Sequence, residues 1–286
     1  MPRFDYLAPA TLDEALEQLR HHRDDVKIFA GGQSLVPLLN YRLARPRVVV
    51  DVNDLPLGGV QTDAGRLRLG ALTRHAALVE SPDVARDCPI LAEAAALVGN
   101  VRVRALGTLG GSLAHADPAA ELPMAMMALD AGFTVASASG TRRLMAAEFF
   151  TGALTTALAP DELLTEVDVP VTRGDGWAVE ELSRRPGDFA IVAVATLVRI
   201  DARGRVEDAR IAFGGVADVP VRARAAEEDL RNVEPTTERI AQAAERARDG
   251  LRPASDAFVS GAYRRLVAGV LVQRALARAV TRAMAA

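Results

Sequence analysis

Residues 27–52 have the sequence KIFAGGQSLVPLLNYRLARPRVVVDV, which predicts a strand–glycine turn–helix–strand unit. Residues 27–30 predict a short apolar strand, and residues 35–43 predict a helix with Pro37 in its first turn. The run at 47–52 predicts a second, buried strand. The turn between strand and helix carries Gly31 and Gly32, so backbone N–H groups at the helix start can approach an anion such as a phosphate. Taken alone, the loop is better explained as a plain glycine turn.

A second glycine run, GTLGGS, occupies residues 107–112. It lacks the Gly-Lys-Ser/Thr of a Walker loop, and it does not open a strand–helix crossover as the dinucleotide fingerprint does. For each glycine run, the alternative to ligand binding is that the glycines only form a tight turn. Two such loops on one domain can cradle a diphosphate with backbone donors alone, without a lysine.

Polar residues follow the second run in HADPAAELP, residues 115–123. Asp117 and Glu121 can accept hydrogen bonds from a polyol, but Asp117 before Pro118 is also a good helix N-cap, and spacing alone favours capping. His115 has no visible base or metal partner and is interpreted as a loop histidine.

Two further predicted turns contain residues that could contact a ligand. In RRPGDFA, residues 184–190, Phe189 can place a ring against a planar cofactor, or it can enter the next strand as a core residue. In FGGVAD, residues 213–218, the double glycine indicates either close approach to the backbone or a β-bulge.

Composition excludes several classes of protein. The chain has 286 residues with 34 basic and 37 acidic side chains, a net charge of -3 that gives no case for nucleic acid binding. Cys88 is the only cysteine, so an internal disulfide or an all-cysteine zinc or iron–sulfur site is impossible. The start lacks an apolar signal core, and residues 267–285 read as an amphipathic helix, so we expect a cytoplasmic protein without a transmembrane segment.

The remaining patterns predict an α+β protein. Residues 11–14 form a capping box, residues 66–70, 133–136 and 163–169 read as strands, and residues 73–79 and 90–98 read as helices. Residues 170–176 resemble a linker. Beyond it, residues 180–184, 191–200 and 209–213 predict antiparallel strands, and helices near 237–248 and 257–283 close the chain.

As a set, these motifs resemble the FAD-binding (medium) subunit of the molybdenum hydroxylases, which include carbon monoxide dehydrogenase and xanthine dehydrogenase. The resemblance extends through DELLTEVDVP, RRPGDFAIVAVA, IAFGGVADVPVRA and AYRRLVAGVLVQRAL, and so covers nearly the whole chain. It implies a two-subdomain FAD-binding domain of the vanillyl-alcohol-oxidase type at 1–176, divided near 58. A C-terminal α+β domain with an antiparallel sheet and helices would occupy 177–286.

The resemblance also implies roles for single residues. Both glycine runs would wrap the FAD diphosphate, the acidic residues would contact the ribityl chain and nearby groups, and the aromatic of the GDF turn would pack on the isoalloxazine. These residues are Ala30, Gly31, Gly32, Gln33, Ser34, Leu35, Thr108, Gly110, Gly111, Ser112, Asp117, Glu121 and Phe189. Many carbon monoxide dehydrogenases have tyrosine at the position of Phe189, which weakens the case for carbon monoxide as the substrate.

The function implied is electron transfer within a complex. A large subunit would oxidise the substrate at a molybdenum cofactor, a small subunit would relay electrons through two [2Fe-2S] clusters, and FAD on this chain would pass them to an external acceptor. The trimer would form a dimer. Two alternatives stay open from the residues: a free-standing FAD-dependent oxidase or monooxygenase, and a flavin-binding module without turnover.

Overall fold

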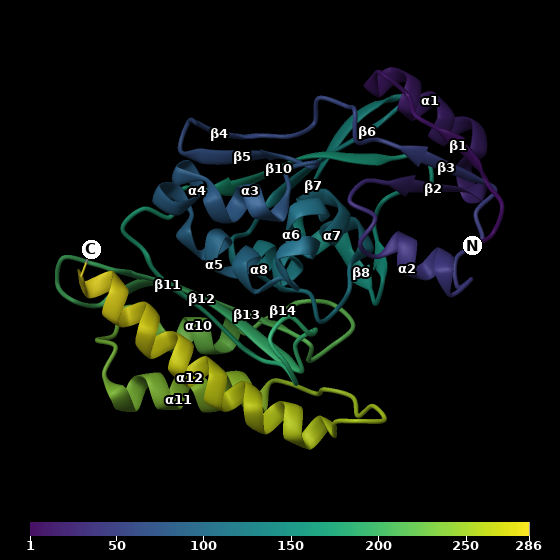
Figure 1. Ribbon diagram of the computed structural model, residues 1–286. Helices are drawn as coiled ribbons and strands as arrows, with labels where there is room; N and C mark the ends of the chain where they lie inside the picture. The colour runs from purple at the N-terminus through teal and green to yellow at the C-terminus, as the bar shows by residue number, and fades with distance from the viewer. Residues whose placement is uncertain (286) are drawn as a thin grey trace.

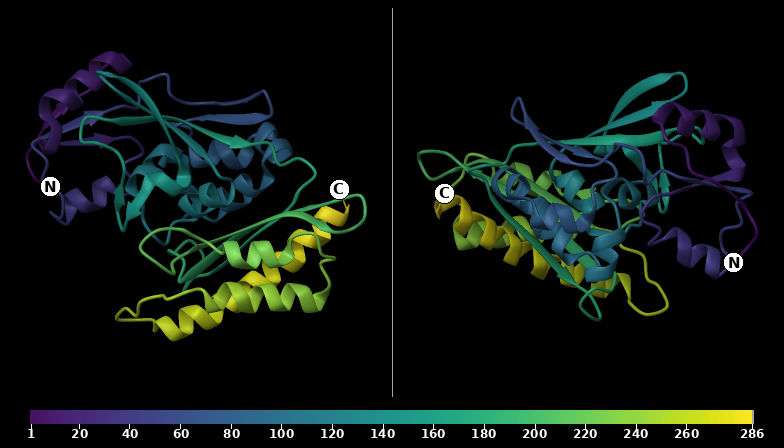
Figure 2. Two further views of the ribbon diagram at one scale, coloured as in Figure 1. Left: turned by 180° about the vertical axis from the view of Figure 1, so that it is seen from behind. Right: turned by 45° about the horizontal axis from the view of Figure 1, so that its top comes forward.

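The computed structural model describes residues 1–285 as an α+β protein in which sheets and helices alternate in layers (Figure 1). A five-stranded sheet is followed by a layer of short helices, then by a four-stranded sheet, and finally by three C-terminal helices. A small N-terminal unit packs against one end of the five-stranded sheet, and the views in Figure 2 show the same order from two other directions.

The N-terminal unit is a parallel three-stranded sheet in the order β1-β3-β2. Its elements are β1 (Asp5–Leu7), α1 (Leu12–His22), β2 (Val26–Phe29), α2 (Leu35–Asn40) and β3 (Val48–Asp51), with a 3-10 turn at Arg23–Asp25. The predicted strand–glycine loop–helix–strand unit and the Thr11–Glu14 capping box are confirmed. The helix α2 ends earlier than predicted, because Arg42 takes a positive φ of 58° and the amide of Leu43 turns back to the carbonyl of Leu38 at 2.9 Å.

The middle unit contains the five-stranded antiparallel sheet, in the order β4-β5-β10-β6-β7. The strand β10 comes last in the sequence and is inserted between β5 and β6. The strands are β4 (Val60–Asp63), β5 (Arg66–Gly70), β6 (Gly132–Ser137), β7 (Gly140–Met145) and β10 (Leu163–Pro170), with a separate hairpin of β8 (Phe150–Gly152) and β9 (Thr155–Thr156).

Short helices cover one side of this sheet. They are α3 (His75–Glu80), α4 (Pro82–Asp87), α5 (Pro89–Leu97), α6 (Val101–Leu106), α7 (Leu109–His115), α8 (Glu121–Ala128) and α9 (Ala146–Phe149). The predicted helix after Pro118 begins only at Glu121, with Ala120 as its N-cap. Asp117 is therefore not a helix cap, and its carboxylate instead accepts the amide of Ala119 at 2.9 Å.

The C-terminal unit is an antiparallel meander of β11 (Gly176–Leu182), β12 (Val192–Ile200), β13 (Val206–Gly214) and β14 (Val221–Arg222). The helices α10 (Arg224–Leu230), α11 (Thr237–Asp249) and α12 (Gly261–Ala285) cover one face, as predicted for an α+β unit. α12 buries one face and exposes the other, which confirms the amphipathic pattern. Among residues 1–285, no helix combines the length and the apolar character needed to cross a membrane.

The other face of the C-terminal sheet belongs to the same core as α5 and α8. The carboxylate of Glu93 on α5 reinforces this contact. It accepts the Trp177 indole N–H at 3.0 Å, the Val179 amide at 3.1 Å and the Arg282 guanidinium at 2.8 Å. The buried apolar core and the carboxylate of Glu93 thus help to fix the C-terminal unit against the helix layer, and with it the turn that carries Phe189.

Candidate functional site

The first glycine segment, residues 31–35, is a row of free backbone donors. Gly32 has a φ of 71°, and the first amide to be satisfied is that of Val36, which donates to the carbonyl of Gly32 at 3.0 Å. Within residues 1–285, the five preceding amides donate to no protein acceptor. Successive N–H groups around a left-handed residue form a concavity that binds anions. The side-chain amide of Gln33 donates to the carbonyl of Gly31 at 2.9 Å and thereby holds the turn.

The second glycine segment is the beginning of α7, whose N-cap is Thr108. Its first amides are engaged. That of Leu109 donates to Thr73 at 2.9 Å, that of Gly110 to Ala71 at 2.7 Å, and that of Gly111 to the Thr108 hydroxyl at 3.1 Å. The expectation that this segment is a loop with free backbone donors is therefore wrong. The row of adjacent free donors in the site is that of the first segment.

The two glycines of α7 serve different purposes. A Cβ on Gly110 would lie 2.6 Å from the Cβ of Ala71, so glycine is needed there for packing against the chain after β5. Gly111 is exposed, and a Cβ there would meet only the hydroxyl oxygen of Thr108, at 2.7 Å. A ligand can therefore lie directly on the backbone at Gly111, beside the half-buried Ser112.

The two segments touch each other although they are far apart in sequence. A Cβ on Gly31 would lie 2.3 Å from the carbonyl oxygen of Leu106 and 2.7 Å from the Cα of Gly107. Figure 1 shows α6 and α7 beside the chain that leads from β2 into α2. The fold thus places the free amides and the bare start of α7 next to one another, as a single ligand would require.

The predicted acidic residues lie where the helix layer meets the C-terminal sheet. The chain at Pro118 is held there because its carbonyl accepts the amide of Gly215 at 2.8 Å. Close approach at the FGGVAD turn is therefore approach of the chain's own backbone. Asp117 is half-buried, whereas Glu121 is only 4 % exposed. Burial, together with the nearby charges of Glu181 and Asp117, raises the pKa of Glu121 to about 7.

Glu181, on β11, is a residue that the sequence did not single out. One of its carboxylate oxygens is buried and has no hydrogen-bond partner within residues 1–285, and burial raises the pKa of this carboxyl as well. Its proximity to Glu121 depends on the packing of the C-terminal sheet on α8, so no local pattern signals it.

Stability should depend on pH through Glu121. Its pKa of about 7 in the fold lies above the ordinary 4.5, so its contribution to stability is full below pH 4.5 and is lost as the pH rises to about 7. The shift corresponds to about 3 kcal/mol. Glu121→Gln, which resembles the protonated carboxyl, should remove this loss in urea unfolding of the FAD-free chain. The exposed Glu207→Gln is the matched control, and an unchanged pH dependence in Glu121→Gln would contradict the assignment.

Phe189 is a surface residue, with 61 % of it exposed, which excludes the alternative of a core phenylalanine. It follows a tight turn in which the amide of Asp188 donates to Arg185 at 3.0 Å and Gly187 has a φ of 84°. A Cβ on Gly187 would lie 2.8 Å from the carbonyl oxygen of Gly99, just before α6. The turn that carries Phe189 therefore lies against the chain that leads into α6, on the helix layer that also carries α7.

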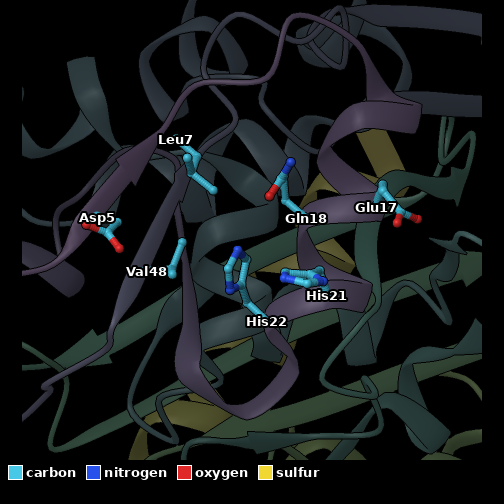
Figure 3. A pocket seen from close by; sticks show the side chains of 7 residues that line it. All are labelled: Asp5, Leu7, Glu17, Gln18, His21, His22 and Val48. Carbon is cyan, nitrogen blue, oxygen red and sulfur yellow. The ribbon is translucent and has the colours of Figure 1, made fainter.

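Other titratable residues lie outside this site. Cys88 is buried, and burial raises the pKa of its thiol to about 12. A hollow between α1 and the strands β1 and β3 contains His21 and His22, the two histidines of the N-terminal unit (Figure 3). It is lined by Asp5, Leu7, Glu17, Gln18, His21, His22 and Val48. In the described part of the chain, no group of histidine, cysteine, aspartate and glutamate side chains is arranged to hold a metal ion.

The sequence matches two known families along nearly its whole length. Residues 2–172 match the FAD binding domain in molybdopterin dehydrogenase, and residues 177–279 match the CO dehydrogenase flavoprotein C-terminal domain. Among similar proteins, the 6-hydroxypseudooxynicotine dehydrogenase complex subunit alpha of Paenarthrobacter nicotinovorans is 42% identical over 99% of this chain and 96% of its own length. The caffeine dehydrogenase subunit beta of a Pseudomonas species is 39% identical over 98% and 95%.

Solved structures agree with this relationship. A chain of carbon monoxide dehydrogenase from Hydrogenophaga pseudoflava superimposes with a TM-score of 0.95 and 38% identity over 98% of both chains. A chain of quinoline 2-oxidoreductase from Pseudomonas putida superimposes with a TM-score of 0.95 and 39% identity over 99% of both. The expected fold, an FAD-binding domain followed by a C-terminal α+β domain, is confirmed. The chain belongs to the family of FAD-binding subunits of the molybdenum hydroxylases, together with the medium chain of carbon monoxide dehydrogenase.

Proposed function

We propose that FAD binds across the first glycine segment and the beginning of α7. The observation that carries this is the row of five free amides at residues 31–35 around a left-handed glycine, a donor set that fits a diphosphate. The bare backbone at Gly111 would let the cofactor lie close to α7. The full set of contacts is Ala30, Gly31, Gly32, Gln33, Ser34, Leu35, Thr108, Gly110, Gly111, Ser112, Asp117, Glu121 and Phe189.

The cofactor, when bound, supplies electron transfer, and the residues of this chain bind and orient it. Because the amides of Leu109, Gly110 and Gly111 are engaged, α7 would contribute shape and the Thr108 and Ser112 hydroxyls rather than backbone donors. Asp117 and Glu121 would face the ribityl hydroxyls. A protonated Glu121 can donate as well as accept a hydrogen bond there, which suits a buried carboxyl whose pKa is raised to about 7.

The function we propose is that of the electron-transferring FAD subunit of a molybdenum-containing dehydrogenase. It would receive electrons from the [2Fe-2S] clusters of a small subunit, which in turn receives them from a large molybdenum-cofactor subunit that oxidises the substrate. Relatives named as a complex subunit and as medium chains support a multi-subunit assembly. One of the similar structures is a carbon monoxide dehydrogenase that lacks the Mo-pyranopterin moiety of its molybdenum cofactor. The alternative of a free-standing FAD-dependent oxidase finds no such support.

The same proposal includes the assembly of the subunits, the location of the protein and the division of this chain into domains. We expect the three subunits to form a dimer of heterotrimers in the cytoplasm. The chain itself would divide into an FAD-binding domain at 1–176, with subdomains meeting near 58, and a C-terminal domain at 177–286. The two family matches, which end at residue 172 and begin at residue 177, support a boundary at that place.

The experiment that tests this function compares reduction of the flavin by the native substrate in the complete complex and in the isolated chain. Fast reduction in the complex and nearly none in the isolated chain supports the subunit role. Equal rates would overturn it.

Phe189→Ala should alter the flavin more than the fold. We propose that the exposed ring packs on one face of the isoalloxazine, so its removal should shift the flavin absorbance or reduction potential. Since 61 % of the residue is exposed, the unfolding free energy should change by much less than the roughly 3–5 kcal/mol of a core phenylalanine. Visible spectra and urea unfolding measure the two effects, with the exposed Phe258→Ala as control. A core-sized loss of stability with an unaltered spectrum would refute the stacking role.

A further inference from the structure

One chain of hydrogen bonds connects the two glycine segments through a residue that the sequence did not single out. Arg74, the N-cap of α3, donates from its guanidinium to the carbonyl of Leu106 and, at 2.7 Å, to the side-chain oxygen of Asn53. The amide group of Asn53 donates in turn to the carbonyl of Ala30 at 2.8 Å. The bonded carbonyls are those of Ala30, which immediately precedes the five free amides, and of Leu106, which immediately precedes Gly107.

The backbone around Arg74 belongs to the same arrangement. Its neighbour His75 donates its amide to the carbonyl of Gly107 at 3.0 Å, and a nitrogen of the buried His75 ring lies 2.9 Å from the carbonyl oxygen of Thr108. The amides of Leu109 and Gly110 also donate hydrogen bonds to the chain at 71–73. Residues 71–75 thus fix the position of the start of α7 by backbone hydrogen bonds. Arg74 is thus fixed by its own backbone at the junction of the two segments.

The charge of Arg74 is not compensated within the protein. Its guanidinium is half-buried and forms no ion pair with a carboxylate of residues 1–285. Both acceptors that it meets are neutral, and a guanidinium has five N–H donors, so several remain for a ligand. A half-buried cation with spare donors, next to five free amides, complements a group with more than one negative charge.

We propose that Arg74 binds the diphosphate of FAD, and that Asn53 is a positioning residue which fixes Arg74 and the first glycine segment relative to each other. This inference rests on the FAD site proposed above and extends it. It assigns to the site a cation that the two glycine runs alone do not provide. Arg74 would contribute charge, whereas Asn53 would contribute only geometry.

The test measures dissociation constants of FAD and of ADP, which carries the diphosphate without the flavin, for the full chain stripped of cofactor. Arg74→Ala should weaken both ligands by about ten- to a hundred-fold, since it removes charge-assisted hydrogen bonds. It should also reduce the dependence of binding on salt, because a screened charge pair is gone. Asn53→Ala should weaken both ligands less and leave the salt dependence as in the wild type.

Two further variants protect the test against loss of the fold. Arg74→Lys keeps the charge without the planar fork, so it should retain the salt dependence while losing part of the affinity. Arg102→Ala, on the exposed face of α6, is the matched control and should bind both ligands as the wild type does. Wild-type affinity in Arg74→Ala, or a loss confined to FAD with ADP unchanged, would overturn the role of Arg74. A wild-type chain that bound neither ligand would overturn the FAD site itself.

Discussion

Replacing Gly111 by aspartate should strongly weaken FAD binding and leave the fold intact. The residue is exposed, and a side chain there would project from the bare backbone on which we place the cofactor. A carboxylate about 4 Å from a phosphate is repelled by roughly 4 kcal/mol at the effective dielectric of a protein surface. We therefore expect the affinity for FAD to fall by at least about a hundred-fold.

The same substitution suits the helix. Gly111 is the third residue of α7, where a negative charge interacts favourably with the helix dipole by about 0.3–1 kcal/mol. Glycine is also among the least favourable residues within a helix. The new Cβ would displace the hydroxyl of Thr108 and cost its capping bond, typically about 1 kcal/mol. These effects nearly cancel, so circular dichroism and the unfolding midpoint should stay close to those of the wild type.

Two neutral variants separate charge from bulk. Gly111→Asn has nearly the shape of the aspartate variant without its charge and should retain more affinity, and Gly111→Ala should retain most of it. Flavin stoichiometry of the purified proteins, with fluorescence titration of the stripped chains, gives the comparison. FAD bound at wild-type stoichiometry in folded Gly111→Asp would show that the cofactor does not lie on α7.

The sequence predicted the first glycine segment better than the second, and the reason is physical. In residues 31–35 the donors are free because nothing nearby in the chain accepts them, and a glycine between a strand and a helix signals this locally. At Gly110 the acceptor is the carbonyl of Ala71, and at Leu109 it is that of Thr73. Such distant partners leave no mark in the run GTLGGS itself, so a loop with free amides was the natural expectation.

The charged part of the site was equally hidden. Arg74 is recognised as part of the site only because Asn53 and Leu106, from other parts of the chain, accept its hydrogen bonds. Glu181 is recognised only because the packing of the C-terminal sheet brings its charge near Glu121 on α8. Sequence patterns therefore predicted most of the longer strands, the long helices and the free-amide turn. They missed the strands β1, β4, β7, β8, β9 and β14 and the short helices α4, α6, α7, α9 and α10. The helices α6 and α7, for example, have only six and seven residues, which is too few for a helical period to stand out.

Reduction of the flavin should be fast in the complete complex and nearly absent in the isolated chain. The reason is the chemistry that this chain possesses. Its single cysteine, Cys88, is buried with a pKa raised to about 12, so the chain has neither a thiol pair nor a cysteine set for an iron–sulfur cluster. In the described residues no group of side chains is arranged to hold a metal ion. In the subunit role proposed above, electrons would reach the cofactor from a donor on another subunit.

A free-standing oxidase makes a different demand on the same site, because it must take a proton from its substrate beside the flavin. The candidate acceptor there is Glu121, a buried carboxyl whose pKa is raised to about 7. Stopped-flow reduction by the native substrate should be compared in the complex and in the isolated chain, each as wild type and as Glu121→Gln. If the isolated chain reduced its flavin as fast as the complex, and Glu121→Gln slowed it, the chain would be an oxidase in its own right. If reduction required the complex and survived Glu121→Gln within it, the carboxyl would serve cofactor binding alone, and the substrate's proton would be removed on a partner subunit.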